Sequence, residues 1–171
     1  MVLNIPTVSQ IRGYEEIGEA SSAGADGVVF TLQQEYRHIM MIGGAYGVGG
    51  TSPSLYLRCN TDAAGYSNQV IYTTNSAENV LNRIANDPGI HLGTANLNGR
   101  SSIMLEGSVS RYQGCNRAFT ARIAENSTAT AIYFRLVGGR WNNTADPLTT
   151  MRIYSTTTAL VAYDFLLLGK R

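Results

Sequence analysis

Short runs in which apolar and polar residues alternate make up most of the chain, and turn-forming residues separate them. In one run Ile132, Phe134 and Leu136 take every second position, opposite Tyr133 and Arg135. The same alternation recurs at residues 30–32, 55–60, 102–109, 119–123, 151–154 and 163–170. A period of two places one face of each strand, here the face with Ile132, Phe134 and Leu136, against a core. The pattern predicts an all-β protein built as an antiparallel β-sandwich.

The run over residues 37–46 differs because it is apolar on both faces. Ile39 and Met41 share one face, and Met40 and Ile42 share the other. A strand of this kind is typical of the centre of a sheet or of an interface, where neither face meets water.

One segment, residues 76–88, departs from the two-residue period. Its apolar residues recur at helical spacing, at Val80, Leu81, Ile84 and Ala85. Ser76 is a suitable N-cap, and Asp87-Pro88 would end the helix. We therefore expect one short helix over about residues 77–86, which covers a sheet edge or an open end of the sandwich.

The chain is expected to contain one domain behind an extended arm. Residues 1–13 include Pro6 and follow no clear period, which predicts an N-terminal arm that packs on a neighbour or is loosely ordered. Residues 14–171 contain no internal repeat and no second hydrophobic unit. Since 171 residues suit a single core, we expect one β-sandwich domain over residues 14–171.

Charge is scarce in this sequence. Charged residues make up 15% of the chain, below the roughly 25% of typical soluble domains. Ser, Thr, Asn and Gln supply the polar positions instead, which favours contact with other protein because few charges must lose water. The net charge of +1 gives no basic patch for direct nucleic-acid binding.

The start of the chain and its apolar stretches give no targeting signal. Residues 1–6 lack the basic start and apolar run of a signal peptide. No apolar stretch approaches the roughly 18 residues that span a bilayer, so we expect no membrane partner. Cys59 and Cys115 form no ligand pattern, and two buried thiols in a reducing cytoplasm are favoured over a disulfide, which stays open.

Motifs for cofactors and metals are missing. The glycine-rich run at residues 43–52 has no lysine and precedes a predicted strand, so it is interpreted as a long turn and not as a phosphate-binding loop. His38 and His91 have no ligand partner nearby in sequence, and we expect both to be hydrogen-bonded strand residues. We therefore expect no cofactor and no metal site.

Catalytic motifs are missing as well. No Gly-x-Ser-x-Gly elbow occurs, and neither cysteine has a protease-like context. Among the acidic residues, Glu106 and Glu125 lie in core-like strands, and a surface or hydrogen-bonded role is favoured for each over paired-carboxylate catalysis. The sequence predicts that the chain is not an enzyme.

Tyrosine stands out among the aromatic residues, with 10 Tyr against 4 Phe and 1 Trp. Tyrosine gives a large, stiff contact area with a polar tip, and arginine and tyrosine are both enriched at interfaces. Many of these residues could equally be half-buried strand residues. The candidate interface residues are Tyr14, Tyr46, Tyr56, Arg58, Arg135 and Trp141.

Several short motifs follow one another in a characteristic order. Residues 29–42 place a tyrosine, basic residues and aliphatic residues before a Gly/Ser/Thr loop. Residues 55–66 form an aliphatic strand followed by Asn, a small residue, Asp and then Tyr. Residues 138–144 contain a Gly-x-Trp turn, and residues 148–155 and 166–169 form two closing strands. In this order and spacing, over about residues 14–171, the chain resembles a diverse group of tailed-bacteriophage virion proteins.

The sequence departs from that group at two places. Leu167-Leu-Gly stands where the group usually has Leu-Tyr-Gly, and the predicted helix near residues 77–86 is an addition. The resemblance implies a jelly-roll-like β-sandwich in a structural virion protein, with no catalytic residues to carry over. Members of this kind are commonly homotrimers.

Three functions follow, in decreasing order of support. The first is a capsid decoration (cement) protein that is made in the host cytoplasm, sits on the virion surface and binds the major capsid protein or other virion proteins. The second is a tail or head-fibre adhesin that binds host-surface glycan, with Trp141 as a platform for a sugar ring. The third is an enzyme acting on envelope polymers through Glu106 or Glu125. The sequence does not fix the position on the particle.

Overall fold

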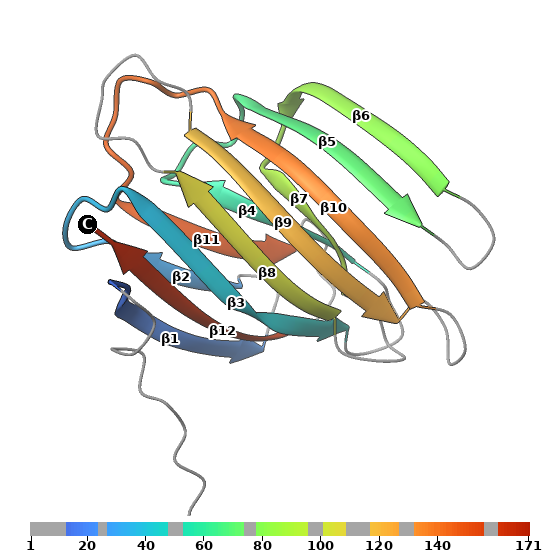
Figure 1. The fold of residues 1–171 in the computed structure, drawn as a ribbon, viewed down its shortest axis with the longest axis horizontal. Coiled ribbons are helices and arrows are strands. Elements are labelled where there is room, and N and C mark those ends of the chain that lie inside the picture. Colours follow the sequence, from blue (N-terminus) through green and yellow to red (C-terminus); the bar gives the residue numbers. More distant parts are fainter. Residues whose placement is uncertain are drawn as a thin grey trace, which may run out of the picture.

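The computed structural model describes residues 13–23, 27–47, 53–73, 78–95, 101–108, 117–126, 132–155 and 161–171. This part of the chain contains twelve β-strands and no helix (Figure 1). The strands are β1 (Glu15–Ala23), β2 (Val28–Thr31), β3 (His38–Gly47), β4 (Ser54–Cys59), β5 (Tyr66–Thr73), β6 (Glu78–Asp87), β7 (Ile90–Thr94), β8 (Ser101–Ser108), β9 (Arg117–Asn126), β10 (Ile132–Trp141), β11 (Thr150–Ser155) and β12 (Val161–Lys170). Within these ranges no helix could cross a membrane.

The strands form two antiparallel sheets that lie one behind the other (Figure 1). The large sheet has eight strands in the order β1-β12-β3-β8-β9-β10-β5-β6, and the small sheet has four in the order β2-β11-β4-β7. The prediction of an all-β protein is therefore confirmed. Two facing antiparallel sheets also agree with the predicted β-sandwich.

Strands from the two ends of the chain pair with each other. In the large sheet β12 lies between β1 and β3, and in the small sheet β11 lies between β2 and β4. Two hairpins, β5–β6 and β9–β10, extend the large sheet beyond β8, where β10 pairs with β5. Most strand pairings join segments that are far apart in sequence. Local sequence patterns therefore cannot predict which residues lie side by side in the sheets.

The core fills the space between the two sheets. The inward positions of most strands are those that the alternation predicted, for example Leu55 and Leu57 on β4 and Met151 and Ile153 on β11, which are buried, while Arg58 points away. Full burial of one such aliphatic side chain stabilises the fold by about 1.5–3 kcal/mol, as an upper estimate. Large side chains with almost no exposed surface include Trp141, Tyr66, Phe165, Ile39, Met41, Leu55, Leu57, Ile90, Leu92, Ile103, Leu105 and Ile123.

The predicted helix over residues 77–86 is wrong, because this segment forms β6, which pairs with β5 at the edge of the large sheet. An isolated helix of ten residues is only marginally stable, and β-branched residues such as Val80 and Ile84 have a slightly lower helix propensity. The free edge of β5 instead offers partners for the backbone N–H and C=O groups. Pro88, which has no N–H group, follows directly after the end of the strand.

The predicted orientation of residues 132–136 is also wrong. Val137 and Trp141 are fully buried, which makes the odd-numbered positions of β10 the inward ones. Phe134 and Leu136 therefore point away from the core and are exposed. The prediction was wrong because it relied on the short apolar run at residues 132–136. The buried residues of β10 lie further along the strand, at odd-numbered positions.

The predicted N-terminal arm and one cysteine fall largely outside the described residues. Of residues 1–13, the structure describes Gly13 alone. This residue lies just before β1 and has a φ of 79°. Cys59 is a free, buried thiol, as predicted for it, while Cys115 lies outside the described ranges. Burial raises the pKa of the Cys59 thiol, which keeps the sulfur protonated and unreactive.

Candidate interaction surface

The outer face of the large sheet, meaning the face that points away from the small sheet, carries a row of side chains that are apolar except for Arg122. The row is set by the ladder: each member pairs directly with the next across β12, β3, β8, β9, β10 and β5. Side chains opposite one another in antiparallel strands lie about 4.5–5.5 Å apart at Cβ, so the row is continuous. Its members are Leu166, Ile42, Met104, Arg122, Leu136 and Ile71.

Exposed large hydrophobic residues gather on this face. Among the described residues, six of the seven are here, and the seventh, Val29, lies on the small sheet. Ile132 is the most exposed of them, at 64% of its surface. Scattered exposed apolar residues are ordinary, whereas a contiguous group marks an interaction surface. The six are Ile42, Tyr46, Ile71, Ile132, Phe134 and Leu136.

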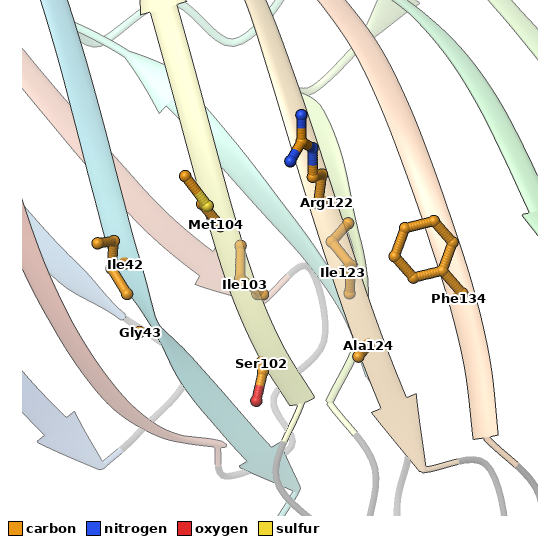
Figure 2. Close-up of a pocket in the computed structure, with 9 residues that line it drawn as sticks. All are labelled: Ile42, Gly43, Ser102, Ile103, Met104, Arg122, Ile123, Ala124 and Phe134. Atoms are coloured by element: carbon orange, nitrogen blue, oxygen red, sulfur yellow. The ribbon is translucent and has the colours of Figure 1, made fainter.

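A shallow depression of about 320 Å³ lies in this face between Ile42 and Phe134 (Figure 2). Small residues on the strands between them, Ser102 on β8 and Ala124 on β9, leave this space open. Among the described residues that line it there is no carboxylate, histidine or cysteine, and Arg122 is the one charged residue. Its chemistry suits an aliphatic or aromatic group and not proton transfer.

Two opposite charges lie in the middle of the outer face on adjacent strands. Arg122 on β9 pairs with Met104, and Glu106 on β8 pairs with Thr120 in the next outward position of the ladder. Within the described residues neither Arg122 nor Glu106 forms an ion pair or a hydrogen bond. The two side chains are diagonal neighbours on these strands and line the same small hollow with Met104 and Thr120.

Tyr14 and Tyr46 are the two predicted interface residues that lie at or near this face. Tyr46 is on β3 and 48% exposed. The Tyr14 ring meets the His38 ring edge-on, with centroids 5.8 Å apart. Burial, and then the negative charge of Glu106, raises the pKa of the Tyr14 hydroxyl. Tyr14 therefore borders the side of the outer face that Glu106 occupies.

Tyr56 and Arg58 lie instead on the far side of the small sheet, where they form a compact cluster with Tyr154. Arg58 Nη2 donates a hydrogen bond to Tyr154 Oη at 2.8 Å, and its guanidinium lies 4.5 Å from the centroid of that ring. Tyr154 Oη donates in turn to the Pro88 carbonyl at 2.8 Å. The Tyr56 ring contacts His91 edge-on at 5.2 Å. These contacts join β4, β7 and β11, and both tyrosines are largely buried.

Arg135 lies between the sheets in an ion pair with Glu125. Arg135 Nε donates to Glu125 Oε1 at 2.6 Å, and Glu125 Oε2 accepts the Thr94 N–H at 2.8 Å. The guanidinium also lies 5.5 Å from the centroid of the Tyr72 ring. The pair links β9 and β10 of the large sheet to β7 of the small sheet, and Glu125 is thus hydrogen-bonded inside the protein.

Trp141 lies in a buried corner with no exposed surface. Its Nε1 donates to Asp62 Oδ2 at 2.8 Å, and the Arg117 guanidinium lies 4.7 Å from its ring centroid. Asn143 Nδ2 donates to the same Asp62 oxygen at 3.0 Å. No face of the indole is free for a sugar, which disagrees with the hypothesis of a glycan platform at this residue.

The two acids considered for catalysis are not brought together. Glu106 points outward from the large sheet and Glu125 inward, on opposite sides of the same layer. His91 is buried against Tyr56, and His38 lies beside Tyr14. No group of three or more His, Cys, Asp or Glu side chains arranged to hold a metal is found among the described residues.

The sequence pointed to part of this surface. Met40 and Ile42, on the second apolar face of residues 37–46, indicated an interface or a central strand, and β3 is central in the large sheet with Ile42 exposed. Phe134 and Leu136 were missed because they were expected in the core. Comparison with family models, curated proteins and solved structures gives no match for this chain.

Proposed function

We propose that this chain is a structural protein of a bacteriophage particle, and most specifically a decoration (cement) protein that binds the shell of the head. The observation that carries the proposal is the order of the strands. Further support for the proposal comes from the motifs that resemble tailed-phage virion proteins and from their positions in the fold.

The proposed fold is a jelly roll with two inserted hairpins. When an eight-stranded antiparallel ribbon is rolled up, strands 1, 8, 3 and 6 form one sheet, and strands 2, 7, 4 and 5 form the other. Setting aside β5–β6 and β9–β10, the remaining eight strands have the orders β1-β12-β3-β8 and β2-β11-β4-β7, which are these two sequences. Viral capsid proteins are among the main users of this architecture.

The positions of the resembling motifs agree with this interpretation. The Asn60-to-Tyr66 segment and the turn with Trp141 are far apart in sequence but meet at one corner. Tyr66 pairs with Trp141 across β5 and β10, and Tyr66 Oη accepts the Cys59 N–H at 2.7 Å. Asn60, with a φ of 52°, accepts the Thr149 N–H through its side chain at 2.8 Å. Both motifs thus have a structural task that does not involve catalysis.

The mechanism we propose is binding energy alone. A protein that binds the assembled shell more tightly than free subunits shifts the equilibrium toward the shell by mass action. Low charge reduces the desolvation cost at the contact with the major capsid protein. In this proposal the chain acts as a homotrimer on the virion surface and binds nucleic acid nowhere directly.

The test is binding to expanded, undecorated heads of the phage whose genome encodes the chain. We expect co-sedimentation with these heads and a higher temperature of head disruption. Expanded heads of an unrelated phage serve as the control and should not bind. Absence of binding to the cognate heads contradicts the proposal. Counting copies in the mature particle separates the alternatives, since hundreds indicate head decoration and a handful indicate a tail or head-fibre adhesin.

A further inference from the structure

A polar hollow of about 470 Å³ lies at one edge of the sandwich, where β1 begins and β2 ends. The segment that joins β2 to β3 passes close to the end of the chain here (Figure 1), and the Arg37 N–H donates to the Lys170 carbonyl at 2.8 Å. Seven of the eight described residues that line the hollow have side chains that can form hydrogen bonds, and Ile17 is the exception. Pockets of roughly 300–1,000 Å³ hold small organic ligands, so the hollow has a suitable size for a polar one.

Four of the lining side chains hold one another in place. Arg171 Nε and Nη2 donate to Glu15 Oε1 and Oε2 at 3.1 and 3.2 Å, which is a forked contact between two planar groups. Gln34 Nε2 donates to Glu15 Oε1 and also to Tyr36 Oη, the second bond at 3.0 Å. Tyr36 itself is buried. Because these side chains are already ordered, a ligand that binds beside them loses less affinity to their conformational entropy.

Other groups in the hollow can bind a ligand directly. The side chains of Glu16, Thr31 and Gln33 are exposed and form no hydrogen bond or ion pair within the part of the chain that the structure describes. The Gln34 carbonyl oxygen likewise accepts no hydrogen bond from the described residues. An amide side chain places a donor and an acceptor next to each other. The hollow therefore presents two amides, one hydroxyl and one carboxylate.

The charges around the hollow disfavour a charged ligand. Arg171 neutralises Glu15, and Glu16 lies on the same wall. An adjoining hollow of about 300 Å³ adds one charge of each sign, from Glu35 and Arg37. An anion would therefore meet carboxylates, and a cation would meet guanidinium groups. A neutral molecule with several hydroxyl groups avoids both conflicts, because each hydroxyl can donate to a carboxylate or an amide oxygen and accept from an amide N–H.

We propose that this hollow binds a neutral saccharide unit, whose neighbouring hydroxyl groups contact Gln33, Gln34 and Glu16. The site is distinct from Trp141, which is buried in another part of the fold. The sugar buries little apolar surface here, so we expect a dissociation constant of about 1 mM for a single unit. The site does not depend on the proposed function, since sugar binding and head binding can each occur without the other.

The experiment is a titration of the ¹⁵N-labelled full chain with sugars, followed by ¹H–¹⁵N correlation spectra. The probes are glucose, galactose, mannose and N-acetylglucosamine, each at up to about 50 mM, well above the expected dissociation constant. Glycerol is the control for nonspecific binding of hydroxyl groups. We expect at least one sugar to shift the side-chain amide signals of Gln33 and Gln34 in a saturable way, and glycerol to leave them unchanged. Glucuronate, an anion, should bind more weakly than glucose.

Substitutions test whether the hollow is the site. Gln33→Ala removes an exposed amide and should weaken binding at least about fivefold, with no change in the β-type circular dichroism. Gln69→Ala, on β5 toward the opposite edge of the large sheet, is the matched control and should keep the affinity of the unchanged chain.

Three results would overturn the proposal: no saturable shift with any of the four sugars, shifts confined to residues outside the hollow, or equal affinities of Gln33→Ala and Gln69→Ala. A chain that binds sugar but no phage heads would contradict the proposed function alone. A chain that binds heads but no sugar would contradict this site alone.

Discussion

Trp141 Nε1 donates a hydrogen bond to Asp62 Oδ2 at 2.8 Å, although the two residues are 79 positions apart in the chain. The same oxygen accepts a second hydrogen bond from Asn143. The turn that follows β4 and the loop that follows β10 are thereby fixed to each other at one corner. Arg117 closes this corner, donating to the main-chain oxygens of Asn143 at 2.5 Å and Asp146 at 2.6 Å.

Asp62→Ala should therefore lower the free energy of unfolding by about 1–3 kcal/mol, because it leaves the buried indole N–H of Trp141 without an acceptor. Urea denaturation followed by circular dichroism measures the change. Thr61→Ala, at the exposed neighbouring position, is the control and should stay within about 0.5 kcal/mol of the unchanged chain. Equal effects of the two substitutions would show that the corner contributes little.

The ion pair of Glu125 and Arg135 should behave as a buried one. Glu125→Ala leaves the Arg135 guanidinium between the sheets without its anion and the Thr94 N–H without its acceptor. We expect a loss of about 3–5 kcal/mol in the free energy of unfolding. Chemical denaturation at one fixed protein concentration is the appropriate measurement, since self-association would shift the apparent stability.

The double variant Glu125→Leu/Arg135→Met provides the contrast. It removes both charges and keeps apolar volume, so it should be more stable than Glu125→Ala alone. A double variant no more stable than Glu125→Ala would instead mean that loss of the ion pair itself, and not the unpaired charge, determines the decrease in stability.

Alternation along the chain was enough to predict the fold class and many inward positions, because burial on one face leaves a period of two. It failed at β6, where a 3.6-residue pattern in a ten-residue segment was overruled by the open edge of β5. It failed again on β10, where the run ending at Leu136 has the parity opposite to that of Trp141. In both cases the deciding contact is with a strand distant in sequence.

The candidate surface was harder to predict than the fold. Arg135 and Trp141 are residue types that are enriched at interfaces but lie inside the molecule, because each has an acidic partner that no local pattern reveals. Arg122, which the sequence analysis did not single out, is notable only for its neighbours on β8 and β10. Only the ladder brings these residues together.

Two glycines with positive φ should differ sharply in their tolerance of alanine. Gly27 has a φ of 72°, and a Cβ there would lie 1.8 Å from the Ile153 carbonyl oxygen. Gly65 has a φ of 85° with nothing within 4 Å of an added Cβ. Gly65→Ala should therefore cost about 1–2 kcal/mol for the left-handed backbone alone.

Gly27→Ala should cost more than about 4 kcal/mol, because the clash is with main chain that cannot move aside without breaking the pairing of β2 and β11. Thermal unfolding of both variants checks the order. Gly138→Ala, where an added Cβ meets nothing within 4 Å and no positive φ is involved, is the neutral reference. A Gly27→Ala protein as stable as Gly65→Ala would contradict the close approach.

Alkaline pH should destabilise the fold through Tyr163. Burial raises the pKa of its hydroxyl to about 12, against an ordinary value of 10.0 in the unfolded chain. Above pH 10 the unfolded chain loses this proton while the folded chain keeps it, so the unfolded state binds fewer protons and stability falls as pH rises. The contribution of Tyr163 to stability is complete below pH 10 and disappears progressively toward pH 12, at up to about 1.4 kcal/mol per pH unit.

Tyr163→Phe should flatten the decline in stability between pH 10 and 12 in urea titrations, whereas Tyr46→Phe, on the exposed outer face, should leave the slope of that decline unchanged. Parallel declines for Tyr163→Phe and the unchanged chain would assign the alkaline sensitivity to other buried groups, of which Cys59 and Tyr66 also have pKa values raised by burial.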